Sequence, residues 1–127
     1  MITVLIFLGV LTTLILVHEL GHFLTAKAYG VKVLEFGLGF PPRLFSIRKG
    51  ETVYSVNAIP LGGFVRLLGE EDPTDPRSLA SRGIIPRVVV LSAGSFMNVL
   101  LPLVIFTLML SIPYKVVEGR VQVIEVA

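Results

Sequence analysis

Two long apolar blocks dominate the pattern of hydrophobic and polar positions. The first runs from Ile2 to Val17, 16 residues without a charged side chain. A membrane span needs about 20 residues, and the helical pattern continues through HELGHFLTAKAY to Gly30, a good helix stop. A secretory signal peptide is the competing interpretation, but the basic start and the small-residue cleavage site of such peptides are absent. The pattern predicts a first transmembrane helix over residues 1–29.

The second block runs from Val88 to Ile112 and has 25 residues without a charge. This length is sufficient to cross a bilayer. Pro102 lies inside the block and should kink the helix, because proline lacks the backbone N–H of the helical ladder. We predict a second transmembrane helix over residues 88–113.

The segment between the blocks, residues 30–68, favours β structure. The stretch RLFSIRKGETVYSVNAI contains two β-prone runs joined at Lys49-Gly50, which predicts a hairpin. Its many apolar residues could hardly be buried by an independent soluble domain, so we expect the sheet to lie against the membrane or dip into it. The sheet either offers a free strand edge to an extended peptide or serves as a structural cap on the helices. The breakers that flank the hairpin are Gly37, Gly39, Pro41, Pro42, Pro60, Gly62 and Gly63.

Residues 69–87 form a polar, turn-rich segment that predicts an exposed loop. Its carboxylates could ligate a metal, although such clusters are far more often solvated turns. These acidic residues are Glu70, Glu71, Asp72 and Asp75. The predicted fold class is therefore an α-helical membrane protein with a β insertion, in which two transmembrane helices flank a re-entrant β-hairpin or small sheet.

Composition and charge support a membrane protein. The chain is 54% hydrophobic and 16% charged, whereas soluble domains carry about 25% charged residues. It has no cysteine, which excludes disulfides and thiolate metal sites, and its net charge of +2 does not suggest a nucleic-acid partner. Nine of the eleven basic residues lie between the two blocks, so the positive-inside rule predicts residues 23–87 on the cytosolic side and both termini outside.

The polar group HELGH, which ends the first block, is the strongest functional signal. His18 and His22 are four residues apart and share one helix face, so both imidazoles can reach one metal ion. Glu19 can stand beside that ion and act as general base toward its water, as in the HExxH zinc motif. A helix that starts at residue 2 brings His18 about 24 Å into a core about 30 Å thick, where ionisable groups are costly and usually functional. Gly21 weakens the helix, and room for another backbone or a substrate is the expected reason.

A long stretch of the chain reads VHELGHFLTAKAYGVKVLEFGLGFPPRLFSIRKGETVYSVNAIPLGGFVRLLGEEDPTDPRS. This stretch resembles the N-terminal half of the site-2 protease family of intramembrane zinc metalloproteases. More specifically, the stretch is similar to bacterial regulated-intramembrane-proteolysis members of the family, which resemble the sigma-E-activating protease. The resemblance implies that His18 and His22 bind zinc and that Glu19 activates the water. It also implies a multi-pass protein of the inner (plasma) membrane that cleaves transmembrane segments of single-span proteins.

Other positions match the family less completely. Its G-P-x-x-N pattern corresponds to Gly94, Ser95 and Asn98, with serine in place of the usual proline. Asn98 and the pair Gly62 and Gly63 are candidates for substrate binding, although Asn98 could equally join two helices.

A catalytic zinc site takes three protein ligands, and this chain offers two histidines. The resemblance implies that the third ligand is an aspartate in a later transmembrane helix, within an L-D-G motif that this sequence lacks. Residues 114–127 resemble the start of a PDZ domain on the outer side, so we expect the chain to be part of a longer protein. The alternative function is a non-catalytic membrane adaptor that binds substrate through its sheet edge. A transporter is disfavoured, since no inverted repeat is present.

Overall fold

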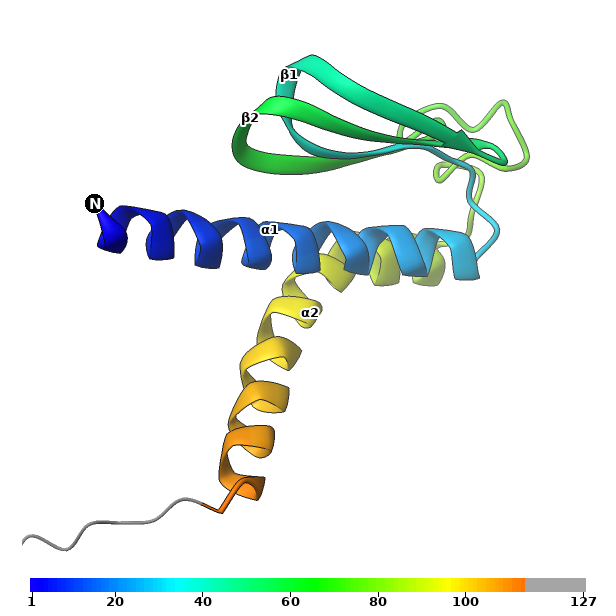
Figure 1. Cartoon of the computed structure of the whole chain (residues 1–127). Coiled ribbons are helices and arrows are strands. Elements are labelled where there is room, and N and C mark those ends of the chain that lie inside the picture. Colours follow the sequence, from blue (N-terminus) through cyan, green and yellow to red (C-terminus); the bar gives the residue numbers. More distant parts are fainter. Residues whose placement is uncertain (114–127) are drawn as a thin grey trace, which may run out of the picture.

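The computed structural model describes residues 1–113 and contains four elements. They are α1 (Ile2–Ala28), β1 (Val33–Lys49), β2 (Thr52–Leu67) and α2 (Ile84–Ser111). Along the chain, two long apolar helices thus flank the two strands, which form one sheet (Figure 1), and the predicted fold class is confirmed. The predicted start of a PDZ domain, at 114–127, lies outside the described residues.

Both helices are long and apolar enough, by length and composition, to cross a membrane. Helix α1 continues through HELGH and stops at Tyr29, before Gly30 with a φ of +71°. This is the stop that the sequence predicted. Helix α2 begins at Ile84, ahead of the uncharged block, and contains Pro102. Proline at 102 cannot donate to the carbonyl of Asn98, and α2 bends in its middle, away from α1 (Figure 1).

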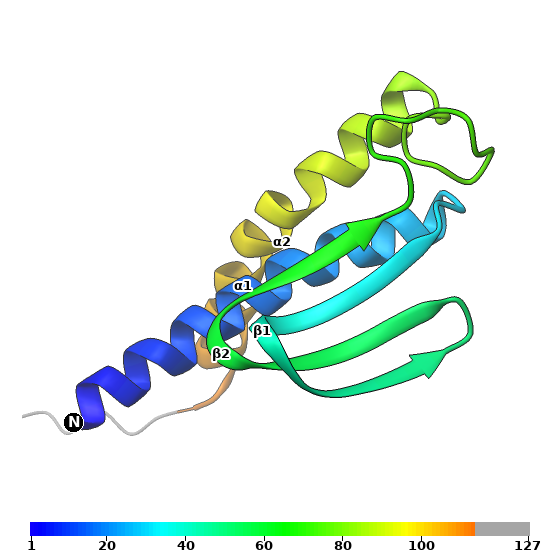
Figure 2. The same cartoon turned by 90° about the horizontal axis from the view of Figure 1, so that it is seen from above.

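The sheet is more extensive than a simple hairpin. A tight turn at Gly50, where φ is +63°, places Lys49 opposite Thr52 as predicted. Both strands continue through the glycines and prolines that flank the hairpin and bend back, so that each strand supplies two segments. The segment 33–38 pairs with 63–67 on one side and, running in the same direction, with 53–56 on the other. The order across the sheet is therefore 43–49, 52–57, 33–38 and 63–67 (Figure 2).

One buried carboxylate links all four segments of the sheet. Glu35 is 4% exposed and accepts hydrogen bonds from Arg43 at 2.6 Å and Ser55 at 2.8 Å. Arg66 lies 3.1 Å from its second carboxylate oxygen. A buried charge is tolerated when it is paired and hydrogen-bonded, so this cluster fixes how the bent strands lie against one another.

Helix α1 lies between the sheet and α2 (Figure 1). The last segment of β2, residues 63–67, is the edge of the sheet nearest α1 (Figure 2). A Cβ built at Gly63 would lie 3.3 Å from Ile15 Cγ2 and 3.5 Å from Glu19 Cγ. Gly63 therefore lies directly beside the HELGH turn of α1, with little space left between the sheet edge and the helix.

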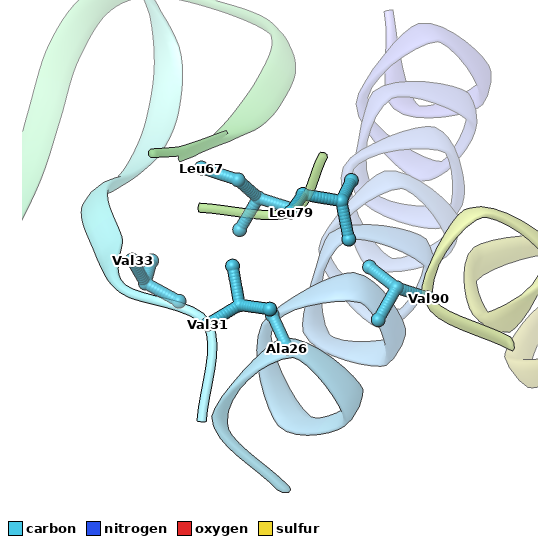
Figure 3. Packing of buried hydrophobic residues seen from close by; sticks show 6 residues of the cluster. All are labelled: Ala26, Val31, Val33, Leu67, Leu79 and Val90. Atoms are coloured by element: carbon cyan, nitrogen blue, oxygen red, sulfur yellow. The ribbon is translucent and has the colours of Figure 1, made fainter. Parts of the chain in front are cut away.

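A small hydrophobic core joins the end of α1, the sheet and the start of α2. Its members are Ala26, Val31, Val33, Leu67, Leu79 and Val90 (Figure 3). The prediction of an exposed loop holds for residues 70–77 but is wrong for Ser78 and Leu79, which are buried. The physical reason is that the loop returns to the sheet: the amides of Leu79 and Ala80 donate to the carbonyls of Leu68 and Gly69. Leu79 can then fill the core.

Candidate metal centre

The two histidines of HELGH bring their ring nitrogens together on one face of α1. The Nε2 atoms of His18 and His22 lie 3.1 Å apart, and the ring centroids are 4.8 Å apart. The spacing of four residues along a helix accounts for this closeness.

The orientation of His22 is set by the backbone of α2. Its Nδ1 lies 2.7 Å from the carbonyl oxygen of Val90. A carbonyl oxygen can only accept, so Nδ1 carries the proton, and Nε2 of the neutral ring presents a lone pair. Histidines that bind metals usually have such a partner on the other ring nitrogen.

The donor set fits a zinc ion. Two nitrogen ligands at the usual distance of about 2.0–2.1 Å from a tetrahedral zinc lie about 3.3 Å apart, close to the observed 3.1 Å. The described residues, 1–113, contain no group of three or more His, Cys, Asp or Glu side chains that could hold a metal ion. Within this part of the chain, zinc would therefore have the two imidazoles as its protein ligands.

Glu19 faces a cavity next to the histidine pair. The cavity has a volume of about 300 Å³ and combines the polar groups of α1 with apolar side chains of the sheet edge and of α2. The backbone amide of Val65, on β2, faces the Glu19 carboxylate. The lining residues are Glu19, His22, Phe64, Val65, Leu67, Glu70, Val90 and Leu91. A proton-accepting carboxylate, an imidazole and a strand backbone thus meet at one cavity.

Gly21 has the role that its position in the motif suggested. A Cβ built at Gly21 would lie 2.5 Å from the carbonyl oxygen of Ala93 and 2.8 Å from Met97 Cγ. The prediction that Gly21 makes room for another backbone is confirmed, and that backbone belongs to α2. This close crossing brings Val90 to His22.

The three candidate substrate-binding residues lie in different places. Gly63 borders Glu19, as described above, whereas a Cβ built at Gly62 would lie 2.4 Å from the ring of Phe40. Asn98 lines a separate apolar groove of about 460 Å³ between α1 and α2. Its Oδ1 is buried and has no hydrogen-bond partner within residues 1–113. The structure therefore brings Gly63, but not Gly62 or Asn98, next to Glu19.

The acidic loop makes turns. Asp72 and Asp75 accept hydrogen bonds from the backbone amides of Thr74 and Arg77, and the contacts with Thr74 lower the pKa of Asp72 below its usual range. Glu70 is the loop carboxylate that lines the Glu19 cavity.

Sequence reasoning missed the parts of the centre that are backbone. The Val90 carbonyl and the Val65 amide belong to residues whose side chains give no chemical signal. Gly94 was noted only as part of a family pattern, yet it faces both histidines. Gly94 follows Val90 by four residues, so the sequence could have indicated that the two lie on the same face of the second helix.

The comparison with known families agrees with this fold and with the HELGH motif at its helix crossing. The model of peptidase family M50 matches residues 6–126. The chain therefore belongs to peptidase family M50, and its recognition as a site-2 protease relative is confirmed.

Individual relatives support the assignment. The chain is similar to "Putative zinc metalloprotease CPE1693" of Clostridium perfringens, with 52% identity over 75% of this chain and 29% of the relative. It is 41% identical, over 87% of this chain and 26% of the relative, to "Probable membrane metalloprotease ARASP2, chloroplastic" of Arabidopsis thaliana. It is 50% identical to "Zinc metalloprotease RasP" of Geobacillus kaustophilus, over 54% of this chain and 16% of the relative. The chain thus spans less than a third of the length of these three relatives.

Proposed function

We propose that this chain forms the N-terminal part of an intramembrane zinc metalloendopeptidase that cleaves transmembrane segments of membrane proteins. The observation that carries the proposal is the meeting of the His18 and His22 Nε2 atoms beside the cavity that Glu19 lines. Membership of family M50 and relatives named zinc metalloproteases support it.

His18 and His22 would hold the zinc ion through Nε2, with the His22 ring fixed by its Nδ1–H bond to Val90. When bound, zinc supplies a Lewis acid that lowers the pKa of water to about 7. Glu19 is the general base: it accepts the proton from the attacking water and passes it to the leaving amine. The aspartate expected from the family resemblance would complete the ligand set.

The substrate would lie along the sheet edge. Residues 63–67 pair with β1 on one side only within the described chain, and an extended peptide can add to a free edge by backbone hydrogen bonds. This edge passes Glu19 at Gly63 and Val65. We therefore propose that Gly63, with Gly62 beside it, positions the substrate. The substrates would be single-span membrane proteins. Asn98, in the separate groove between the helices, would contact a part of the substrate away from this edge.

The membrane placement follows from charge and exposure. From the family resemblance we place the protein in the inner (plasma) membrane, and we place residues 23–87 on the cytosolic side because most basic residues lie there. The bend of the sheet and its outer segment 43–49 would touch lipid, since large apolar side chains are exposed there and such patches mark membrane or protein contacts. These side chains are Phe40, Leu44, Phe45, Ile47, Ile59 and Leu61.

The test is the variant Glu19→Gln in the intact protein, assayed on a membrane-embedded substrate. Loss of a general base should reduce cleavage by about 10²–10⁴-fold, while membrane insertion and bound zinc stay unchanged. Glu71→Gln is the matched control, because Glu71 is exposed and outside the cavity. If the Glu19 variant cleaves like the control, Glu19 is not the base.

A non-catalytic adaptor is the second candidate. It is favoured by the lack of a third ligand in the described residues. An adaptor would bind the substrate without cleaving it even in the unaltered protein, so the same assay separates the two functions.

A further inference from the structure

Gly94 of α2 lies directly opposite the two zinc-binding candidates. A Cβ built on Gly94 would be 2.5 Å from His18 Nε2 and 2.6 Å from His22 Nε2. These are the two nitrogens whose lone pairs would bind the ion. A side chain at position 94 would therefore occupy the space in which the two nitrogens converge.

The conformation of the backbone does not explain this glycine. Gly94 lies inside α2, and its φ is not in the left-handed region. Glycine is disfavoured in helix interiors compared with alanine, so the open space is the feature that requires it. Gly94 also lies one turn after Val90, whose carbonyl binds the other end of the His22 ring. One face of α2 thus lies opposite both ring nitrogens of His22.

We propose that Gly94 is a positioning residue of the metal centre, which keeps open the volume that a bound ion occupies. This inference rests on the proposed zinc site and extends it to the second helix. A methyl group at position 94 would compete with the ion for the same space and push the imidazoles apart.

A side chain added at Gly94 should have a different effect from one added at Gly21. At Gly21 the obstacle is the backbone of Ala93, which cannot move without separating the helices. At Gly94 the obstacles are the ends of two imidazole rings, which can turn aside by rotation about their side-chain bonds. Alanine at 94 should therefore disturb metal binding while the helix packing survives.

The experiment compares Gly94→Ala with Gly9→Ala in the intact protein, purified in detergent. Gly9 is the matched control, because it also lies in a helix and a Cβ there would meet nothing within 4 Å. Bound zinc is measured by elemental analysis, and Co²⁺ affinity by visible absorption. We expect Gly94→Ala to lower metal affinity by at least about tenfold, the scale of changes around metal ligands, and Gly9→Ala to leave it unchanged.

A second measurement separates blocked binding from damaged packing. The melting temperatures of chelator-treated proteins should be equal for Gly94→Ala and the unaltered chain, or higher for the variant. The inference is overturned if Gly94→Ala binds metal as the unaltered protein does, or if its metal-free form melts as early as that of Gly21→Ala. An unaltered protein without metal would instead refute the proposed function itself.

Discussion

The two halves of α1 belong to one continuous helix but have different surroundings. In the first half, apolar side chains such as Ile2, Leu5 and Phe7 are more than 60% exposed, and Gly9 has open space around it. In the second half, Gly21 packs on α2, and Ala26 is fully buried. Hydropathy marks α1 as a single candidate membrane span, so the HELGH group and the contacts with α2 are what separate the site from the rest of the helix.

This contrast can be tested with alanine at the two glycines of α1. Gly21→Ala should destabilise the protein by about 1–3 kcal/mol, the usual cost of overpacking, because its Cβ would collide with the Ala93 carbonyl. Gly9→Ala should be neutral or stabilising by up to about 1 kcal/mol, since alanine is the better helix former. Thermal unfolding in detergent measures both. Equal melting temperatures for the two variants would contradict the close crossing of α1 and α2.

A smaller effect is expected at the C-terminal end of α1, where Lys27 reaches Glu51. Arg77 holds the Glu51 carboxylate with two hydrogen bonds of 2.5 and 2.7 Å, and Lys27 lies 3.2 Å away. These contacts lower the pKa of Glu51 to about 2. Because the pKa is lower in the folded chain, the contacts stabilise it above about pH 4.5, and this contribution is lost as the pH falls toward 2.

Amide hydrogen exchange in residues 69–83, corrected for the intrinsic effect of pH, should therefore accelerate between pH 5 and pH 2.5. Glu51→Gln is the control: its loop should exchange faster at pH 5 and change less on acidification. The effect should be modest, because solvent weakens exposed ion pairs. A loop that responds to pH equally in both proteins would exclude Glu51 as its anchor.

Sequence reasoning predicted the elements whose signals are local. The apolar blocks, the stop at Gly30 and the turn at Lys49-Gly50 depend on residues close together in the chain. The double pairing of segment 33–38 could not be predicted in this way, because it depends on long-range contacts around Glu35. The burial of Leu79 was missed for the same reason: Leu79 lies in a polar stretch of sequence, and its burial depends on the return of the loop to the sheet.

The candidate metal centre likewise has one part that the sequence predicts and one part that depends on long-range contacts. HELGH identified three side chains from spacing alone, because a helix places residues four apart on one face. The α2 half of the centre consists of the Val90 carbonyl and the empty side of Gly94. A backbone group and an absent side chain become recognisable only when the two helices are placed together.

The most direct test of the central claim is the zinc content of the intact protein, compared with that of His22→Ala. We predict about one zinc ion per chain in the unaltered protein and little or none in the variant, because the ion loses one of the two imidazoles that meet at 3.1 Å. An unaltered protein purified without zinc, or a His22→Ala variant that keeps its full content, would contradict the assignment of His18 and His22 as the metal pair.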